Sequence, residues 1–214
     1  MSRGLGDVYK RQYVFMVVFT TALSFGLTYM FGYEDEASSV PAEDKEAEAI
    51  IEEETTGALP ASLQDETIIS PIVGQAVALS DVNDPVFSSG AMGQGIAIKP
   101  TEGVVYAPAD AEVTIAFATG HAYGLKTANG AEILIHVGID TVSMNGEGFD
   151  QKVAQGDKVK AGDVLGTFDA AKIAAAGLED TTMVIVTNTA DYASVTPVAT
   201  GSVAKGDAII EVKA

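Results

Sequence analysis

GHAYGLKTANGAEILIHVGID (residues 120–140) places two alternating apolar runs on either side of an Asn-Gly dipeptide at 129–130. Asn-Gly flanked in this way is the strongest short-range signal for a β-hairpin. If the dipeptide alone forms the loop, His136 lies opposite Tyr123. Because strand side chains alternate between faces, that register puts His121 and His136 on one face, as a diagonal pair with Cα atoms roughly 7–8 Å apart. The hairpin therefore brings the only two histidines of the chain together.

The rest of the carboxyl-terminal part also consists of short apolar runs separated by turn residues. From Thr67 onward, short β-branched runs are broken by Gly and Asp every 8 to 12 residues or so, as in GIAIKP, GVVYAP and TTMVIVTN. This pattern predicts an all-β fold over residues 67–214, an antiparallel β-sandwich with Greek-key or jelly-roll (barrel-sandwich-like) character. Only residues 169–180 have a helical pattern, with Asp169 as the expected cap and Gly177 near the end.

A Gly-Asp pair entering a strand recurs three times, in QGDKV (155–159), AGDVL (161–165) and KGDAI (205–209). Glycine-rich loops that bind phosphate carry further glycines or a Gly-Lys-Ser/Thr sequence, and neither accompanies these pairs. We interpret them as structural turns.

Composition excludes several classes of function. The 214 residues include no Cys and no Trp, so the chain has no disulfide, no thiolate zinc site and no cysteine nucleophile. The formal charge is −18, which argues against nucleic acid as a partner, because phosphate binding requires clustered Lys and Arg.

The amino-terminal part divides into three segments. Residues 13–33, YVFMVVFTTALSFGLTYMFGY, carry no formal charge and are long enough for a transmembrane helix, with tyrosines near both ends. A signal peptide is the competing interpretation, but the run is long for one and no clear cleavage site follows it. Residues 1–12 end in DVYKRQ, which resembles a translated sequencing adapter, and we interpret them as an artefact.

Residues 34–66 hold twelve acidic residues and one basic residue, Lys45, and so a formal charge of −11 out of the total of −18. This segment also contains Pro41 and Pro60 and few aromatic residues. Such a composition predicts a disordered, solvated linker that spaces the β domain from the membrane.

Three interpretations of the histidine pair stand beside one another. The two residues can be ordinary structural histidines. They can bind a metal, with Asp140 as a third ligand in the manner of zinc peptidases, although such enzymes require a further His. They can also perform covalent chemistry, because a neutral imidazole is a competent nucleophile that accepts a phosphoryl group while its neighbour stabilises charge.

The segment ILIHVGIDTVSMNGEGF, with VFSSGAMGQGIAIKP upstream and GDKVKAGDVL downstream, resembles the glucose-type enzyme IIA domain of the bacterial phosphoenolpyruvate-dependent sugar phosphotransferase system (PTS). The resemblance covers about residues 66–214. It implies a phosphotransferase without a cofactor, in which His136 accepts phosphate on Nε2 from phospho-HPr and delivers it to a cysteine of enzyme IIB. By the same likeness His121 assists the transfer, Thr119 orients a histidine, and Asp140 belongs to the layer of residues around the pair.

The resemblance also implies a binding surface around the histidines. Family members with this pair can bind zinc at a site shared with a partner, which would use His121 and His136, although the phosphoryl transfer requires no metal. Apolar residues around the pair are expected to dock HPr and IIB, with core packing as the alternative for each. These residues are Val86, Phe87, Met92, Phe117, Leu134 and Val142.

The upstream sequence SFGLTYMFGYED resembles the end of the last membrane helix of a permease IIC domain. A IIA domain that follows IIC through an acidic linker is the B-C-A order of β-glucoside, sucrose and trehalose permeases, which predicts attachment to the cell membrane with residues 67–214 in the cytoplasm. Two other functions remain as alternatives. One is a regulatory binding module that uses the same face, and the other is a lipoyl- or biotin-type carrier, which requires an exposed Lys where this hairpin has Asn-Gly.

Overall fold

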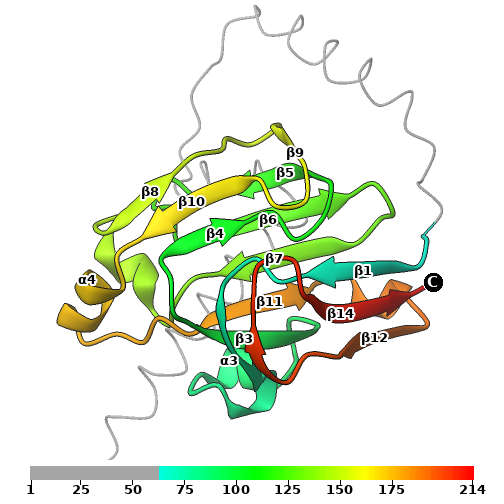
Figure 1. The fold of residues 1–214 in the computed structure, drawn as a ribbon, viewed down its shortest axis with the longest axis horizontal. Coiled ribbons are helices and arrows are strands. Elements are labelled where there is room, and N and C mark those ends of the chain that lie inside the picture. The colour runs from blue at the N-terminus through cyan, green and yellow to red at the C-terminus, as the bar shows by residue number, and fades with distance from the viewer. Residues whose placement is uncertain (1–62) are drawn as a thin grey trace, which may run out of the picture. The chain divides into compact units, whose positions relative to one another are not determined.

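The computed structural model describes residues 63–214, which fold mainly into antiparallel β-structure (Figure 1). The largest sheet has the strand order β13 (Gly201–Val203), β2 (Gly74–Ala78), β3 (Gln94–Pro100), β11 (Thr182–Val186), β7 (Glu132–His136), β6 (Ala122–Thr127), β5 (Ala111–Ala116) and β9 (Lys158–Val159). One smaller sheet contains β1 (Glu66–Ile69), β14 (Ala208–Lys213) and β12 (Ser194–Pro197). The other contains β4 (Val104–Tyr106), β10 (Val164–Phe168) and β8 (Phe149–Gln151). The predicted all-β class is confirmed.

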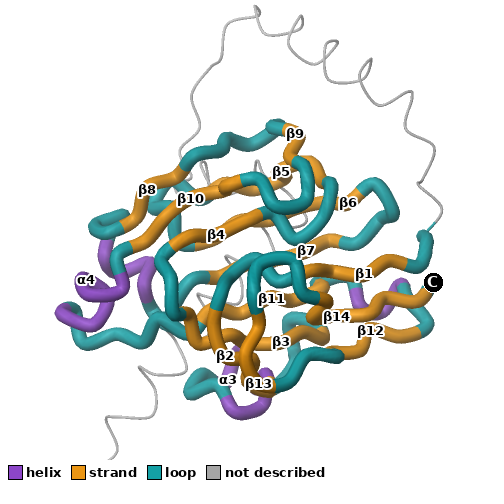
Figure 2. Tube along the Cα trace, in the orientation of Figure 1, coloured by secondary structure: helices purple, strands orange, loops and turns teal. Residues whose placement is uncertain are grey.

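Within residues 63–214, helices are confined to short segments at the margins of the sheets (Figure 2). They are α3 (Pro85–Ser88), α4 (Ala170–Ala175) and the 3₁₀ turns η1 (Leu79–Asp81), η2 (Thr141–Met144) and η3 (Thr189–Asp191). The helix predicted at 169–180 is present but shorter. Its cap is as expected, because the Asp169 carboxylate accepts from the N–H groups of Ala171 and Lys172. Gly177 ends it with φ of +75°, a left-handed conformation that glycine adopts without strain.

Helix α3 was not predicted from the sequence. Asp84 caps it by accepting from the N–H of Val86 at 2.7 Å, and Pro85 occupies the first turn, where a missing N–H does no harm. Four residues are too few to show a helical period, so the pattern carried no signal for it.

The three Gly-Asp pairs form the same turn. Each glycine has φ near +90°, and each aspartate accepts a hydrogen bond at 2.8 Å from the N–H three residues before it. The acceptors are Asp157, Asp163 and Asp207, which lead into β9, β10 and β14. The interpretation as structural turns is confirmed.

The main core lies between the large sheet and the two smaller ones. Ile68 of β1, Leu165 of β10 and Ile98 of β3 belong to one buried cluster and are fully inaccessible. Burying a side chain of this size contributes about 1.5–3 kcal/mol. On β7, Ile133 and Ile135 belong to this cluster whereas the buried Leu134 does not, because successive strand side chains point to opposite faces and His136 alternates with Leu134. His136 therefore belongs to the other face of the large sheet.

Strands β6 and β7 form the predicted hairpin, but the predicted register is wrong by one residue. Ala122, not Tyr123, pairs with His136. The loop has three residues, 128–130, because Thr127 N–H bonds to the carbonyl of Ala131, and Gly130 has φ of +98°. Asn-Gly also suits the last two positions of a three-residue loop with a left-handed third residue, so the dipeptide alone did not decide the loop length.

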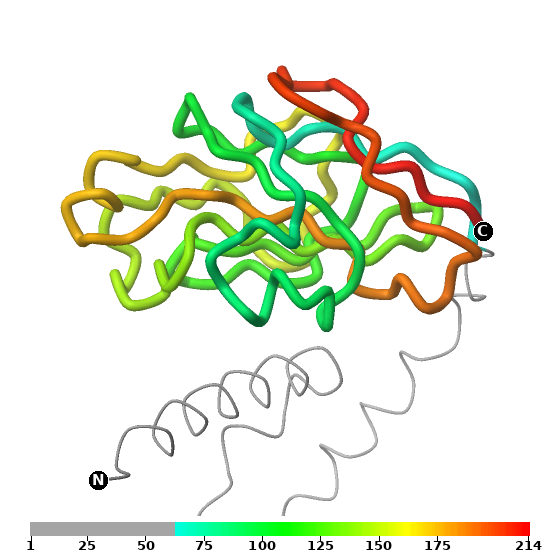
Figure 3. The backbone as a smooth tube through the Cα atoms, turned by 90° about the horizontal axis from the view of Figure 1, so that it is seen from below, coloured from blue at the N-terminus to red at the C-terminus, as the bar shows by residue number. Residues whose placement is uncertain are grey.

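The two ends of the described part meet. Strand β1 pairs with β14, and the Asp65 carboxylate accepts from the N–H of Ala214 at 2.9 Å and from Lys213 at 3.1 Å (Figure 3). Leu63 packs against the core. The segments predicted at 1–12 and 13–33, and residues 34–62 of the predicted linker, lie outside the described residues. Between Leu63 and Ala214 no helix is long and apolar enough to cross a membrane.

Candidate functional site: a buried pair of imidazoles

The two histidine rings meet, as the sequence predicted, but by another route. Their centroids lie 5.0 Å apart with an angle of 80° between the planes. In the observed register, strict alternation would have sent His121 to the opposite face from His136. Instead, Gly120 with φ of +67° precedes His121, which lies just outside β6 and enters it from a turn. The alternation therefore does not extend to His121.

The rings are buried, although the resemblance implied a binding surface around them. Exposure is 3% for His121 and 4% for His136. The aromatic rings of two other segments lie beside them. Phe87 of α3 lies 5.1 Å from the His136 ring, and Phe117 lies 5.3 Å from the His121 ring.

His136 is held in one tautomer. Its Nδ1 lies 2.8 Å from the carbonyl oxygen of Gly138, which can only accept, so Nδ1 carries the proton. The Nε2 atom therefore holds the free lone pair. It is buried and has no hydrogen-bond partner within residues 63–214. A neutral ring with an unshared Nε2 is the reactive form of a histidine nucleophile.

The carbonyl that fixes His136 lies in a tightly built turn. Gly138 has φ of +77°, and a Cβ at this position would collide with Thr141. The buried hydroxyl of Thr141 donates to the carbonyl of Val137 at 2.5 Å. Gly138 and Thr141 were not singled out in the sequence as site residues. The signal that could have found them is the H-x-G spacing, which puts a main-chain acceptor two residues after His136.

Thr119 contacts His121 as the resemblance implied. Its hydroxyl lies 2.6 Å from Nδ1 of His121. This contact leaves Nε2 of His121 free, so both rings use Nδ1 for positioning and keep Nε2 for chemistry. Gly146, with φ of +88°, lies against the backbone of Thr119. This contact links the Asn-Gly-Glu-Gly-Phe segment to the site.

Burial keeps both imidazoles neutral. It lowers the pKa of His121 to about 4. It also lowers the pKa of His136 to about 3, with a further contribution from the adjacent His121 that the hydrogen bond to Gly138 partly opposes. Since a free histidine titrates near 6.5, both rings of the folded protein are uncharged at neutral pH.

These two pKa values predict acid instability. Between about pH 6.5 and about pH 4 the unfolded chain binds more protons than the folded one, so stability is fully present above pH 6.5 and falls as the pH drops. The loss is up to about 1.4 kcal/mol per pH unit for each imidazole. Urea unfolding of the full chain at several pH values measures this slope. The His121→Gln variant should show a shallower slope, and equal slopes in parent and variant would contradict the assignment.

The remaining predicted site residues differ in placement. Asp140 is exposed and has φ of +58°, and its carbonyl accepts from Ser143. It does not form a metal site, since no group of three His, Asp or Glu side chains within residues 63–214 is placed to bind an ion. Of the predicted docking residues, the half-buried ones are Val86, Met92 and Phe117, the buried ones are Phe87 and Leu134, and Val142 is 42% exposed.

Fold and site together define a class of protein: an all-β domain that holds two neutral imidazoles against each other in a buried site. Residues 66–192 match the family described as phosphoenolpyruvate-dependent sugar phosphotransferase system, EIIA 1. The chain belongs to this family. Its domains take phosphate from HPr and pass it to EIIB during sugar uptake, and EIIA components are phosphotransferases.

Several relatives support this assignment. The chain is 43% identical over 194 residues to the PTS β-glucoside-specific EIIBCA component of Dickeya chrysanthemi. The aligned region covers 89% of this chain and 30% of that protein. It is 47% identical over 131 residues to the PTS glucose-specific EIIA component of Bacillus cereus. The aligned region covers 61% of this chain and 79% of that protein. The chain thus spans less than a third of the length of the β-glucoside relative.

A solved structure shares the fold. The glucose permease IIA of Mycoplasma capricolum superposes with a TM-score of 0.66 at 35% identity, and the match covers 69% of this chain and 96% of that one. The lipoyl- or biotin-type carrier and the zinc peptidase considered from the sequence are therefore set aside.

Proposed function

We propose that His136 accepts a phosphoryl group from phospho-HPr on Nε2 and delivers it to a cysteine of enzyme IIB, in support of sugar transport. One observation carries this proposal: Nε2 of His136 is unprotonated and has no partner, because Nδ1 is bound to Gly138. In the step, the Nε2–P bond forms and the N–P bond of the donor breaks. The bonding pair leaves with the donor imidazole, and Nδ1 keeps its proton.

His121 has a different role in this proposal. When the Thr119 hydroxyl donates to Nδ1 of His121, Nε2 carries the proton and can donate to a phosphoryl oxygen on the neighbouring ring. A donor aimed at the charge of a transferring group stabilises the transition state. No nucleotide or metal enters this step, because the phosphohistidine of HPr already carries the energy.

We further propose that the half-buried and exposed apolar residues around the pair bind the partner proteins. Val86, Met92, Phe117 and Val142 retain accessible surface, whereas Leu134 is buried and contributes to packing. Asp140 is exposed beside this surface and belongs to its surroundings.

A zinc ion shared with a partner would fit the pair only in part. Nδ1 of each ring is already hydrogen-bonded, so Nε2 of His121 and Nε2 of His136 are the two nitrogens left to bind it. Zinc takes four ligands, and the described residues offer no third one beside the rings. The partner would have to supply the others.

The context of the whole protein is also a proposal. We infer that residues 13–33 are the last helix of a permease IIC domain and that residues 34–62 belong to its linker to IIA. Residues 63–66, which the sequence analysis assigned to the linker, are instead part of the folded domain, because Leu63 packs against the core and Glu66 begins β1. The domain would then be held at the cell membrane on the cytoplasmic side. The β-glucoside EIIBCA relative, in which IIA is fused to IIB and IIC, supports this arrangement. We also propose that the strands of the domain are connected in a Greek-key or jelly-roll manner, as expected from the sequence.

Labelling tests the phosphoryl transfer. The full chain is incubated with phosphoenolpyruvate, enzyme I and HPr, and tryptic peptides are mapped by mass spectrometry at neutral or alkaline pH. Trypsin cleaves at Lys126, between the two histidines, so each is read separately. We expect one acid-labile phosphate on the His136 peptide. An unlabelled chain that still binds HPr would favour the regulatory binding module.

The linker has a separate expected effect. A short flexible linker gives an effective concentration of IIA near IIB on the order of millimolar. A domain that starts at Leu63 should accept phosphate from HPr as the full chain does, because β1 and both histidines follow that residue. Transport by the reconstituted permease should instead depend on the concentration of added IIA. If the domain that starts at Leu63 were unfolded, the proposed boundary between linker and domain would be wrong.

A further inference from the structure

The nucleophile of the proposed reaction cannot be reached in the structure as it stands. His136 Nε2 is buried and unpartnered, while in-line attack requires the phosphorus of the donor to approach that atom directly. A buried polar atom without a partner is unfavourable unless it has a function. Some group beside Nε2 must therefore move before transfer.

Four rings lie around the pair: the two imidazoles, Phe117 beside His121 and Phe87 beside His136. The two imidazoles are fixed by hydrogen bonds. His136 is held through Nδ1 by Gly138 at 2.8 Å, and His121 is held through Nδ1 by Thr119 at 2.6 Å. Phe87 is the phenyl ring beside His136, and it is apolar and has no hydrogen bond to hold it. It is 2% exposed and lies 5.1 Å from the His136 ring. Phe87 is the group best suited to move.

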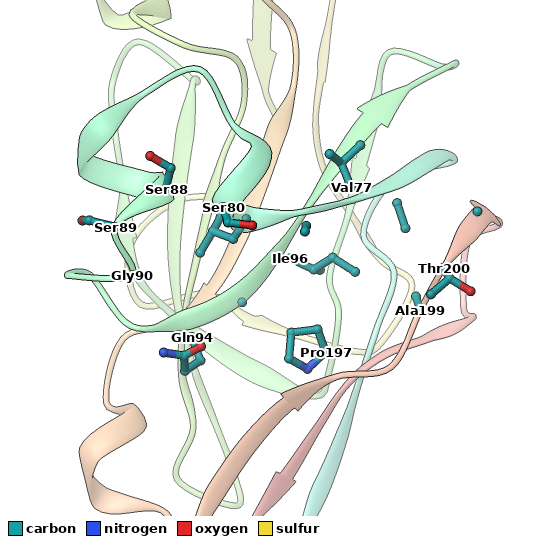
Figure 4. A pocket seen from close by; sticks show the side chains of 15 residues that line it. Val77, Ser80, Ser88, Ser89, Gly90, Gln94, Ile96, Pro197, Ala199 and Thr200 are labelled. Atoms are coloured by element: carbon teal, nitrogen blue, oxygen red, sulfur yellow. The ribbon is translucent and has the colours of Figure 1, made fainter.

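The segment that carries Phe87 is short and lies beside open space. Helix α3 has four residues, and the exposed side chain of Asn83, which precedes its cap, donates to Glu179 at 3.2 Å. Next to α3 is a hollow of about 440 Å³ between the helix and the β12–β13 connection. Figure 4 shows Ser88, Ser89 and Gly90 of this segment on one side of the hollow and Pro197 and Thr200 on the other. The helix thus has space on one side into which it can shift.

We propose that Phe87 controls access to Nε2 of His136, so that only a phosphoryl donor that docks on α3 and displaces this ring can react. This proposal rests on the proposed function of His136. It makes Phe87 a specificity-determining residue: the ring keeps water and small phosphoryl compounds away from the nucleophile. It also explains why a residue expected in a docking surface is buried in the free protein.

Chemical modification measures the access directly. Diethyl pyrocarbonate acylates unprotonated imidazoles, and the two tryptic peptides separated at Lys126 report each histidine. In the full chain near neutral pH, Phe87→Ala should raise the rate at His136 at least about tenfold, since a closed site reacts only through its open fraction. Phe87→Leu should give an intermediate rate.

Val82→Ala is the matched control, because Val82 is buried in the same segment but is not one of the rings around the histidines. We expect the parent rate at His136 in this variant. An equal increase in Val82→Ala and Phe87→Ala would overturn the proposal, because general loosening of the segment would then explain the access. So would an unchanged rate in Phe87→Ala, or equal increases at both histidines with a lowered unfolding temperature.

Phosphoramidate supplies a second measurement. When it phosphorylates an imidazole, the N–P bond of the reagent breaks and ammonia leaves. We expect slow labelling of the parent at His136 and at least about tenfold faster labelling of Phe87→Ala, whereas phospho-HPr should label the parent readily. Equal rates with phosphoramidate would contradict the role of Phe87. A parent that phospho-HPr cannot label would instead refute the proposed function, while the modification rates would still decide the role of Phe87.

Discussion

Replacing His136 by glutamine should abolish phosphorylation of the domain by phospho-HPr. The substitution removes Nε2 of His136, which is unprotonated and has no hydrogen-bond partner within residues 63–214. An amide is not a nucleophile toward phosphorus, so we expect the rate to fall by at least about a thousandfold, to the limit of detection. The measurement is incorporation of phosphate from phosphoenolpyruvate through enzyme I and HPr.

Two control measurements show whether the His136→Gln variant is still folded and still binds its partner. The unfolding temperature of His136→Gln should stay close to that of the parent, because glutamine is similar in size and also polar. Binding of unphosphorylated HPr should be retained, since the half-buried and exposed docking residues are unchanged. Labelling of His136→Gln at the parent rate, or transfer of the label to the His121 peptide, would show that His136 is not the acceptor.

The second large effect is a separation of acceptance from delivery. His121→Gln should still accept phosphate from HPr, because Nε2 of His136 and its bond to Gly138 remain. Delivery to IIB should fall by about 10²–10³-fold, the usual loss when one donor to a developing charge is removed. The variant is loaded with phosphate and then chased with IIB, and the transferred label is counted.

The Thr119→Val variant tests the same role of His121 with a smaller change. It keeps the shape of the side chain but removes the hydroxyl 2.6 Å from Nδ1 of His121. We expect a smaller loss of delivery than in His121→Gln, together with an altered tautomer of His121 in nitrogen NMR spectra. Normal delivery by both variants would exclude a role for the second imidazole.

The sequence predicted much of this domain because its signals are local. Alternating runs give the strands, Asp169 and Gly177 give the ends of α4, and the Gly-Asp pairs give turns that three or four residues build by themselves. The histidine pairing was predicted for a partly wrong reason. The register was off by one, and the turn at Gly120 restored the contact between the rings.

Other features depend on contacts between distant segments. The hairpin loop is held by Glu66, which accepts from Thr127, and by Asn188, which donates to the carbonyl of Gly130. Neither partner is near the loop in the sequence. The burial of His136 likewise depends on Phe87, nearly fifty residues upstream. A pattern within one strand cannot show which segment will lie over it.

The pairing of the two ends has a mechanical consequence. Strands β1 and β14 are antiparallel, with Glu66 opposite Val212 and Ile69 opposite Ala208. A force that pulls Leu63 and Ala214 apart would load their hydrogen bonds one after another, as in opening a zipper, rather than all at once. The domain should therefore yield at low force when it is stretched between Leu63 and Ala214.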